Sequence, residues 1–92
     1  MSLKIEKFED LLVWQEAMDL AEKIYIFFKE NSDFGFRNQI QRAVVSIPSN
    51  IAEGFDWQTN KEYMQFLYIA KGSCSEVRTQ LYLAKRFKFI LS

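Results

Sequence analysis

Histidine is absent from this sequence of 92 residues, and cysteine and proline occur only once each. Without histidine, the chain lacks the side chain most often used for proton transfer near neutral pH and the commonest metal ligand. Its single cysteine, Cys74, cannot form a disulfide within the chain, and the first residues lack an export-signal pattern. We therefore expect a reducing, cytoplasmic setting. No apolar run approaches the roughly 20 residues that a membrane span needs, so we expect a soluble protein.

Net charge is also lacking, because twelve basic and twelve acidic side chains cancel. The cancellation hides an asymmetry. Residues 1–33 hold four basic and eight acidic side chains, whereas residues 59–92 hold six basic and two acidic ones. The two ends either mark different surfaces or attract neighbouring helices to each other. The chain as a whole has no strong electrostatic attraction to nucleic acid.

Apolar residues are abundant for this length, at 49% hydrophobic and 16% aromatic, which favours one folded domain over residues 1–92. Three segments have helical periodicity and none reads as a strand, which predicts an all-α fold. The first helix is predicted from Asp10 to about Glu30, followed by a polar break over residues 31–35. Its predicted core-facing stripe is Trp14, Met18, Ala21, Tyr25 and Phe28, widened by Leu11, Leu20, Ile24 and Phe27.

The third helix is predicted to begin where Thr59 and Glu62 stand in capping-box spacing, and to run for about 26 residues. Its predicted apolar stripe is Tyr63, Phe66, Leu67, Ala70, Cys74, Val77, Leu81 and Ala84. On this pattern Cys74 is interpreted as a small buried hydrophobic residue and not as a nucleophile.

Between them lies the segment "RAVVSIPSNIAEGF", residues 42–55, within a second helix predicted from Phe36 to Gly54. Pro48 lacks an amide hydrogen, so we expect a bend near residues 44–48, with the Val44 carbonyl satisfied by water or a serine hydroxyl. Gly54 is interpreted as the end of the helix. Apolar residues share one face, Ile40, Ala43, Val44, Ile47, Ile51 and Phe55, and polar residues the other, Arg42, Ser46, Ser49 and Glu53.

Together with "VWQEAMDLAEKIY" and "EYMQFLYIAKGSCSEVRTQLYLA", this segment closely resembles the four-helix-bundle family of 23S ribosomal RNA intervening-sequence proteins. The resemblance implies an antiparallel up-and-down helical bundle that assembles as a ring-like homopentamer. It also points to RNA, because family members are often encoded inside insertions in ribosomal RNA genes. Relatives include the accessory variability determinant of diversity-generating retroelements, which partners a reverse transcriptase and nucleic acid. No biochemical activity is established for the usual members.

A typical member of that family continues past the "LAKRFKFIL" region into a fourth amphipathic helix, whereas this sequence ends at Ser92. Three long helices would leave an apolar seam uncovered. Either a neighbouring chain covers the seam, or the chain is a truncated form with altered assembly.

Enzymatic constellations are not found, so we expect no catalytic residues, no metal site, no cofactor and no enzymatic activity. The paired carboxylates Glu16 with Asp19, and Asp19 with Glu22, have no supporting ligands. Ser46 and Ser49 lie on the solvent-facing side of a predicted helix, and the chain has no histidine to activate them. A structural role is therefore favoured over a catalytic serine. We therefore assign contacts between helices or subunits to Arg42, Ser46, Ser49, Asn50 and Glu53.

A basic row marks the third helix, where Lys71, Arg78 and Lys85 recur every seven residues with Tyr82 and Arg86 nearby. Such a row can follow a phosphate backbone while the tyrosine stacks on a base. It can equally be a solvated face, or pair with acidic groups such as Glu16, Asp19 or Glu22 of its own chain or a neighbour. Two hypotheses stay open: an RNA-associated oligomeric module, and a protein assembly scaffold that binds no nucleic acid.

Overall fold

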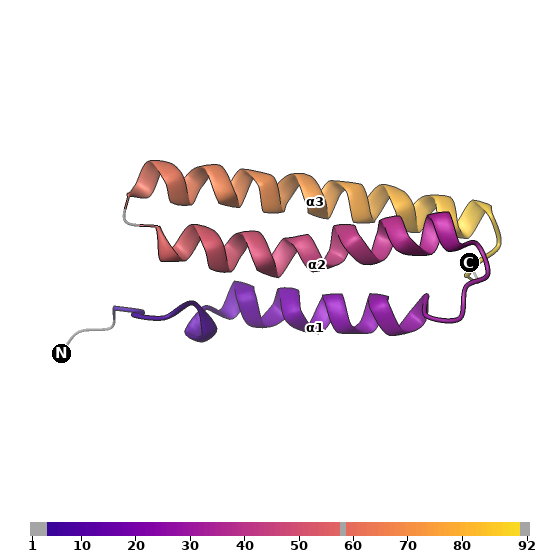
Figure 1. Cartoon of the computed structure of the whole chain (residues 1–92), viewed down its shortest axis with the longest axis horizontal. Coiled ribbons are helices and arrows are strands. Elements are labelled where there is room, and N and C mark those ends of the chain that lie inside the picture. The colour runs from indigo at the N-terminus through magenta and orange to yellow at the C-terminus, as the bar shows by residue number, and fades with distance from the viewer. Residues whose placement is uncertain (1–3, 58, 91–92) are drawn as a thin grey trace.

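The computed structural model describes residues 4–57 and 59–90. Its helices are a short 3-10 helix η1 (Phe8–Asp10) and three α-helices, α1 (Leu12–Phe27), α2 (Phe34–Asp56) and α3 (Asn60–Arg86). The described residues contain no strand, so the predicted all-α up-and-down fold is confirmed (Figure 1).

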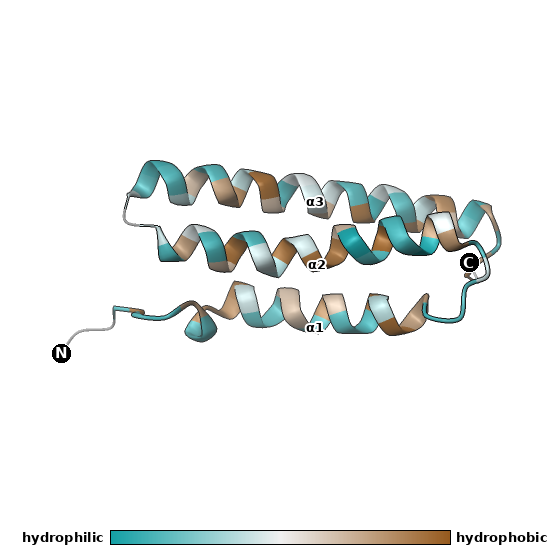
Figure 2. Ribbon diagram, viewed as in Figure 1, coloured by the Kyte–Doolittle hydropathy of each residue, from teal (hydrophilic) through white to brown (hydrophobic). Residues whose placement is uncertain are grey.

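The three helices form an elongated layer, with α2 between α1 and α3 (Figure 1). The middle helix packs against both of its neighbours, whereas the Cα atoms of the described parts of α1 and α3 stay more than 8 Å apart. Apolar and polar segments alternate along each helix (Figure 2). The layer is therefore open along the line between α1 and α3, where a closed bundle would have further cover.

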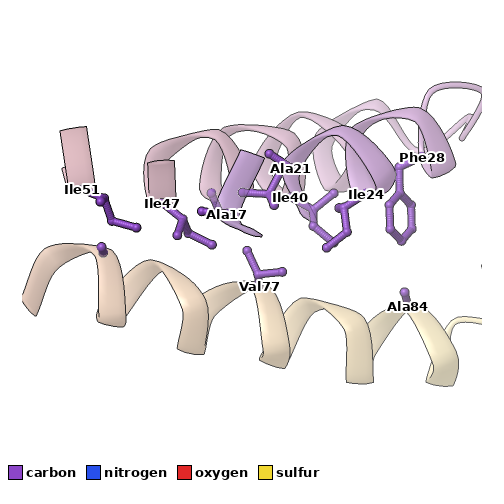
Figure 3. Packing of buried hydrophobic residues seen from close by; sticks show 12 residues of the cluster. Ala17, Ala21, Ile24, Phe28, Ile40, Ile47, Ile51, Val77 and Ala84 are labelled. Atoms are coloured by element: carbon purple, nitrogen blue, oxygen red, sulfur yellow. The ribbon is translucent and has the colours of Figure 1, made fainter. Parts of the chain in front are cut away.

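Buried residues of all three helices meet around α2, and Figure 3 shows α1 and α2 side chains pointing toward α3. Small residues make much of this contact, which lets the helices approach closely. The buried cluster consists of Ala17, Ala21, Ile24, Phe28, Ile40, Ala43, Val44, Ile47, Ile51, Ala70, Val77 and Ala84.

The predicted core-facing stripe of α1 is partly wrong. Met18 and Tyr25 are 44% and 46% exposed, while Ala17, which was not predicted, is buried. Helix α1 therefore faces its neighbours through its alanines. Ile24 and Phe28 of the predicted stripe are buried as well, whereas Met18, Leu20, Tyr25 and Phe27 flank the contact and are exposed.

Side-chain caps define where α2 and α3 begin. Asp33 accepts a hydrogen bond from the Phe36 amide at 3.0 Å, and Thr59 accepts one from the Glu62 amide at 3.3 Å. The Glu62 carboxylate accepts from the Thr59 hydroxyl at 2.6 Å, in place of the backbone contact expected for a capping box. Helix α1 begins at Leu12 because Asp10 belongs to η1.

Pro48 lies inside α2, which runs unbroken from Phe34 to Asp56 and changes direction slightly near its middle in Figure 1. Serine hydroxyls bond the carbonyls on either side of Val44 and not the Val44 carbonyl itself. The Ser46 hydroxyl donates to Ala43 at 2.7 Å, and the Ser49 hydroxyl donates to Val45 at 2.9 Å. Side chains thus add bonds to the backbone around the proline.

Gly54 does not end α2, so that prediction is wrong. It is buried within the helix, and no described glycine has a positive φ. A Cβ atom at this position would lie 2.6 Å from the Cβ of Phe66 and 3.1 Å from Cδ1 of Tyr63. The glycine is present because α2 and α3 approach each other too closely there for any side chain.

Helix α3 ends in a Schellman motif built around Lys88, whose φ is 63°. The Phe89 amide donates to the Ala84 carbonyl at 2.8 Å, and the Lys88 amide donates to the Lys85 carbonyl at 3.1 Å. Glycine usually occupies this left-handed position, because an L-residue with a Cβ atom is strained there.

We therefore expect Lys88→Gly to raise the free energy of unfolding by about 1 kcal/mol, through relief of the left-handed strain. Urea unfolding followed by circular dichroism measures the change. Lys88→Ala serves as the control, because it removes the same charge and keeps the Cβ atom. A glycine variant no more stable than the alanine variant would contradict the assignment of strain.

Candidate interaction surfaces

An apolar groove runs between α1 and α3 over the buried face of α2. Ile47 and Ile51 form its floor in one part, where the open volume is about 380 Å³. The walls there are Val13, Glu16, Ala17 and Leu20 from α1 and Leu67, Ala70, Lys71 and Cys74 from α3. Nearer the end of α3, a second hollow of about 510 Å³ is lined by Lys23, Ile24, Phe27, Phe28, Leu81 and Ile90. We call this surface the α1–α3 groove.

A third apolar hollow, of about 490 Å³, lies between α1 and α2 on the other flank of α1. Trp14, Met18 and Tyr25 line it, and of these residues of the predicted core stripe Trp14 is half-buried against the core, whereas Met18 and Tyr25 are exposed. Its α2 side consists of Val45, Pro48, Ser49 and Ala52, all from the segment 42–55. Both flanks of α1 thus present apolar surface.

Cys74 is exposed, and the prediction that it is a buried core residue is wrong. It lines the α1–α3 groove, because the apolar stripe of α3 is wider than the contact with α2 and this part of it has no covering helix. No group of three or more histidine, cysteine or acidic residues within the described ranges could hold a metal ion.

All members of the predicted basic row, Lys71, Arg78, Tyr82, Lys85 and Arg86, are exposed on α3. Tyr82 has 62% of its surface accessible. Lys71 lines the α1–α3 groove from one wall and Glu16 from the other, without forming an ion pair. Lys85 and Arg86 also lie in the last turn of α3, where positive charge is favourable toward the helix dipole.

The polar face of α2 contacts α3 through one of its predicted residues. The Ser46 and Ser73 hydroxyls share a hydrogen bond at 2.6 Å across the α2–α3 contact. The Asn50 amide donates to the Ser46 carbonyl at 2.7 Å within α2, so the hydrogen bond expected across helices is instead local. Ser49 also bonds within its own helix. Arg42 and Glu53 are exposed, and Arg42 lines a small polar hollow with Glu76.

Gln80 is a buried polar residue that the sequence pattern did not single out, at 7% exposure. Its amide nitrogen lies 3.5 Å from the Glu76 carboxylate, and its buried Oε1 has no hydrogen-bond partner. An unpaired buried acceptor loses its hydration without compensation, which opposes folding.

We expect Gln80→Leu to raise the free energy of unfolding by about 1–2 kcal/mol, since the substitution removes the unpaired acceptor and keeps a similar volume. Gln65→Leu, at an exposed position of the same helix, is the control for helix propensity and should shift stability by about 0.5 kcal/mol or less. Loss of stability in the Gln80 variant by thermal or urea unfolding would show that its amide is satisfied.

Comparison with known proteins places this architecture in a family. The family model described as "23S rRNA-intervening sequence protein" matches residues 9–92, which include all three helices and the groove. The chain belongs to this family. A search of curated proteins finds no match for it. The resemblance predicted from the three sequence segments is therefore confirmed.

In the described part of the chain, no helix combines the length and apolar character that crossing a membrane requires.

Proposed function

We propose that this member of the 23S rRNA-intervening sequence protein family is a self-assembling helical subunit without catalytic activity or cofactor. Its partner is further copies of the same chain, in a homopentamer if it follows the family resemblance. The observation that carries the proposal is apolar surface left open on both flanks of α1. Leu12, Ile26 and Phe27 are each more than 60% exposed.

The energetics of burial favour assembly. Each large apolar side chain moved from water into an interface contributes about 1.5–3 kcal/mol. Association costs about 4–15 kcal/mol in lost freedom of motion, so covering several such side chains is sufficient for a stable contact. The α1–α3 groove adds Val13 and Leu20, which line its α1 wall and are 51% and 41% exposed.

Light scattering coupled to size-exclusion chromatography tests the proposal through a variant. Leu12, Ile26 and Phe27 are replaced together by serine, which removes exposed apolar surface and leaves the residues of the buried cluster unchanged. We expect the variant to keep its helical circular dichroism and to shift toward the monomer mass of 10.9 kDa. An unchanged assembly would show that this surface of α1 contributes nothing to it.

A second candidate function, association with RNA, is favoured by the exposed row of Lys71, Arg78 and Lys85 with Tyr82 beside it. Three lysine or arginine contacts to phosphates release counterions, which makes binding weaken steeply with salt. Several copies in one particle would multiply a modest contact. The opposing fact is the net charge of zero, which provides no general attraction to nucleic acid.

A salt titration of RNA binding by fluorescence anisotropy tests this candidate. Changing Lys71, Arg78 and Lys85 to glutamine should flatten the dependence of log affinity on log salt by about 2–3 units, and Tyr82→Ala should cost about 1–3 kcal/mol if its ring stacks on a base. Glutamine at Lys7, Lys29 and Lys61 is the control with the same change of charge. Coincident curves for the wild type and the first variant would remove the RNA candidate.

A further inference from the structure

Acidic side chains line the outer edge of α1. Glu16, Asp19 and Glu22 are all exposed and unpaired with any basic group of the described residues. Glu16 lines the α1–α3 groove and Glu22 lines the hollow between α1 and α2. These three residues therefore lie on the ridge that separates the two open flanks of the helix. We call this ridge the acidic edge.

A basic rim runs along α3, and its first member, Lys71, lines the α1–α3 groove. Lys71, Arg78 and Lys85 are exposed at seven-residue intervals, so they share one side of the helix over about 21 Å at 1.5 Å per residue. On a helical wheel they alternate with Leu67 and Leu81, which line the groove. The rim is thus a row of mixed basic and apolar side chains.

The acidic edge and the basic rim of one chain do not neutralise each other. The backbones of α1 and α3 stay apart, and Glu16 and Lys71 lie on opposite walls of the groove. Opposite charges that remain separated in one copy are available to a second copy.

Exposed apolar residues accompany the acidic edge of α1, just as apolar residues accompany the basic rim of α3. Leu12 and Ile26 are 67% and 62% exposed, and they lie seven residues on either side of Asp19. The charges of the acidic edge thus follow one another every three residues, with an exposed apolar residue beyond each end, and their sign is opposite to that of the basic rim. Charge complementarity of this kind sets partner choice and orientation in helix pairs.

We propose that the basic rim of α3 in one copy docks against the acidic edge of α1 in a second copy. This inference rests on the proposed self-assembly and specifies its interface. The two surfaces differ, so the contact is head-to-tail: each copy offers its rim to one neighbour and its edge to another. The apolar residues beside the charges provide the burial, and the charges set the orientation.

Charge reversal in the full-length chain tests the proposal. In one variant Lys71, Arg78 and Lys85 become glutamate, and in the other Glu16, Asp19 and Glu22 become lysine. Like charges then face each other in each variant alone, and we expect the dissociation constant for self-association to rise about tenfold or more. When the two variants are mixed, opposite charges meet again wherever unlike copies touch, so particles heavier than either variant forms alone should appear. Sedimentation velocity at low salt follows both effects.

The control variant replaces Lys7, Lys29 and Lys61 with glutamate, which makes the same change in net charge away from the rim, and it should assemble as the wild type does. Reversal variants that both keep the wild-type mass overturn the head-to-tail contact, and so does a mixture that stays dissociated. If the rim variant keeps its mass but loses RNA binding, the rim is a nucleic-acid surface and the contact is again overturned. A monomeric wild type would instead remove the proposed self-assembly itself.

Discussion

Replacing Phe28 with alanine is expected to lower the free energy of unfolding by about 3–5 kcal/mol. Phe28 is only 1% exposed, and its ring packs with those of Phe27 and Phe36 at centroid distances of 5.0 and 5.7 Å. It anchors the end of α1 to the start of α2, and truncation leaves a cavity that helices of this length cannot close by local shifts. Urea unfolding followed by far-ultraviolet circular dichroism measures the loss.

The adjacent residue provides the control. Phe27 is 61% exposed and keeps only an edge contact with Phe28, so Phe27→Ala should lower the stability of the separated chain by about 1 kcal/mol, while weakening self-assembly. Unfolding at the lowest practical protein concentration keeps the two effects apart, because association stabilises the folded state. Equal destabilisation by the two substitutions would contradict the difference in burial between Phe27 and Phe28.

Replacing Gly54 with alanine is expected to destabilise the protein by about 1–3 kcal/mol, even though alanine favours a helix over glycine by about 1 kcal/mol. The added methyl group would lie 2.6 Å from the Cβ atom of Phe66, which is fixed to the α3 backbone. Because a rotamer change cannot relieve this clash, α2 and α3 must move apart. Thermal unfolding of the variant reports the cost.

Gly72 is the matched control for that prediction. It lies within α3, and a Cβ atom added there meets nothing within 4 Å. Gly72→Ala should therefore stabilise the protein by about 0.5–1 kcal/mol through helix propensity alone. If both glycine variants change stability in the same direction, the close approach of α2 and α3 is not the reason why residue 54 is a glycine.

The sequence was most informative for α2. Its buried residues repeat at helical spacing opposite a polar face, so Ile40, Val44 and Ile47 were assigned correctly. Helix α1 has large apolar residues around much of its circumference, and periodicity cannot say which part faces a neighbour. The contact forms through Ala17 and Ala21 because small residues permit the closest approach, and that preference depends on the neighbouring helix.

Other features depend on neighbours that the sequence does not identify. A glycine near the end of a helical pattern can mark a terminus or a close helix contact, and only the position of Phe66 distinguishes these for Gly54. Cys74 fits an apolar stripe, but the stripe is wider than the α2–α3 contact, which leaves the cysteine exposed. The spacing of Lys71, Arg78 and Lys85 does predict a shared exposed side, since a seven-residue interval returns to the same side of a helix.

Self-assembly and RNA association make different demands on the same basic residues. If Lys71 and its neighbours lie against a second copy, they are unavailable to phosphates, and RNA would have to bind elsewhere on the particle. Exposed apolar surface favours assembly more strongly than the basic row favours RNA, because burial requires no net charge, and this chain has none.

Sedimentation equilibrium of the wild-type chain tests self-assembly most directly, because it determines particle mass without assuming a shape. The chain has a mass of 10.9 kDa, and the open groove with the exposed flanks of α1 predicts a particle several times heavier at micromolar concentration. A single species of 10.9 kDa across the micromolar range would contradict self-assembly.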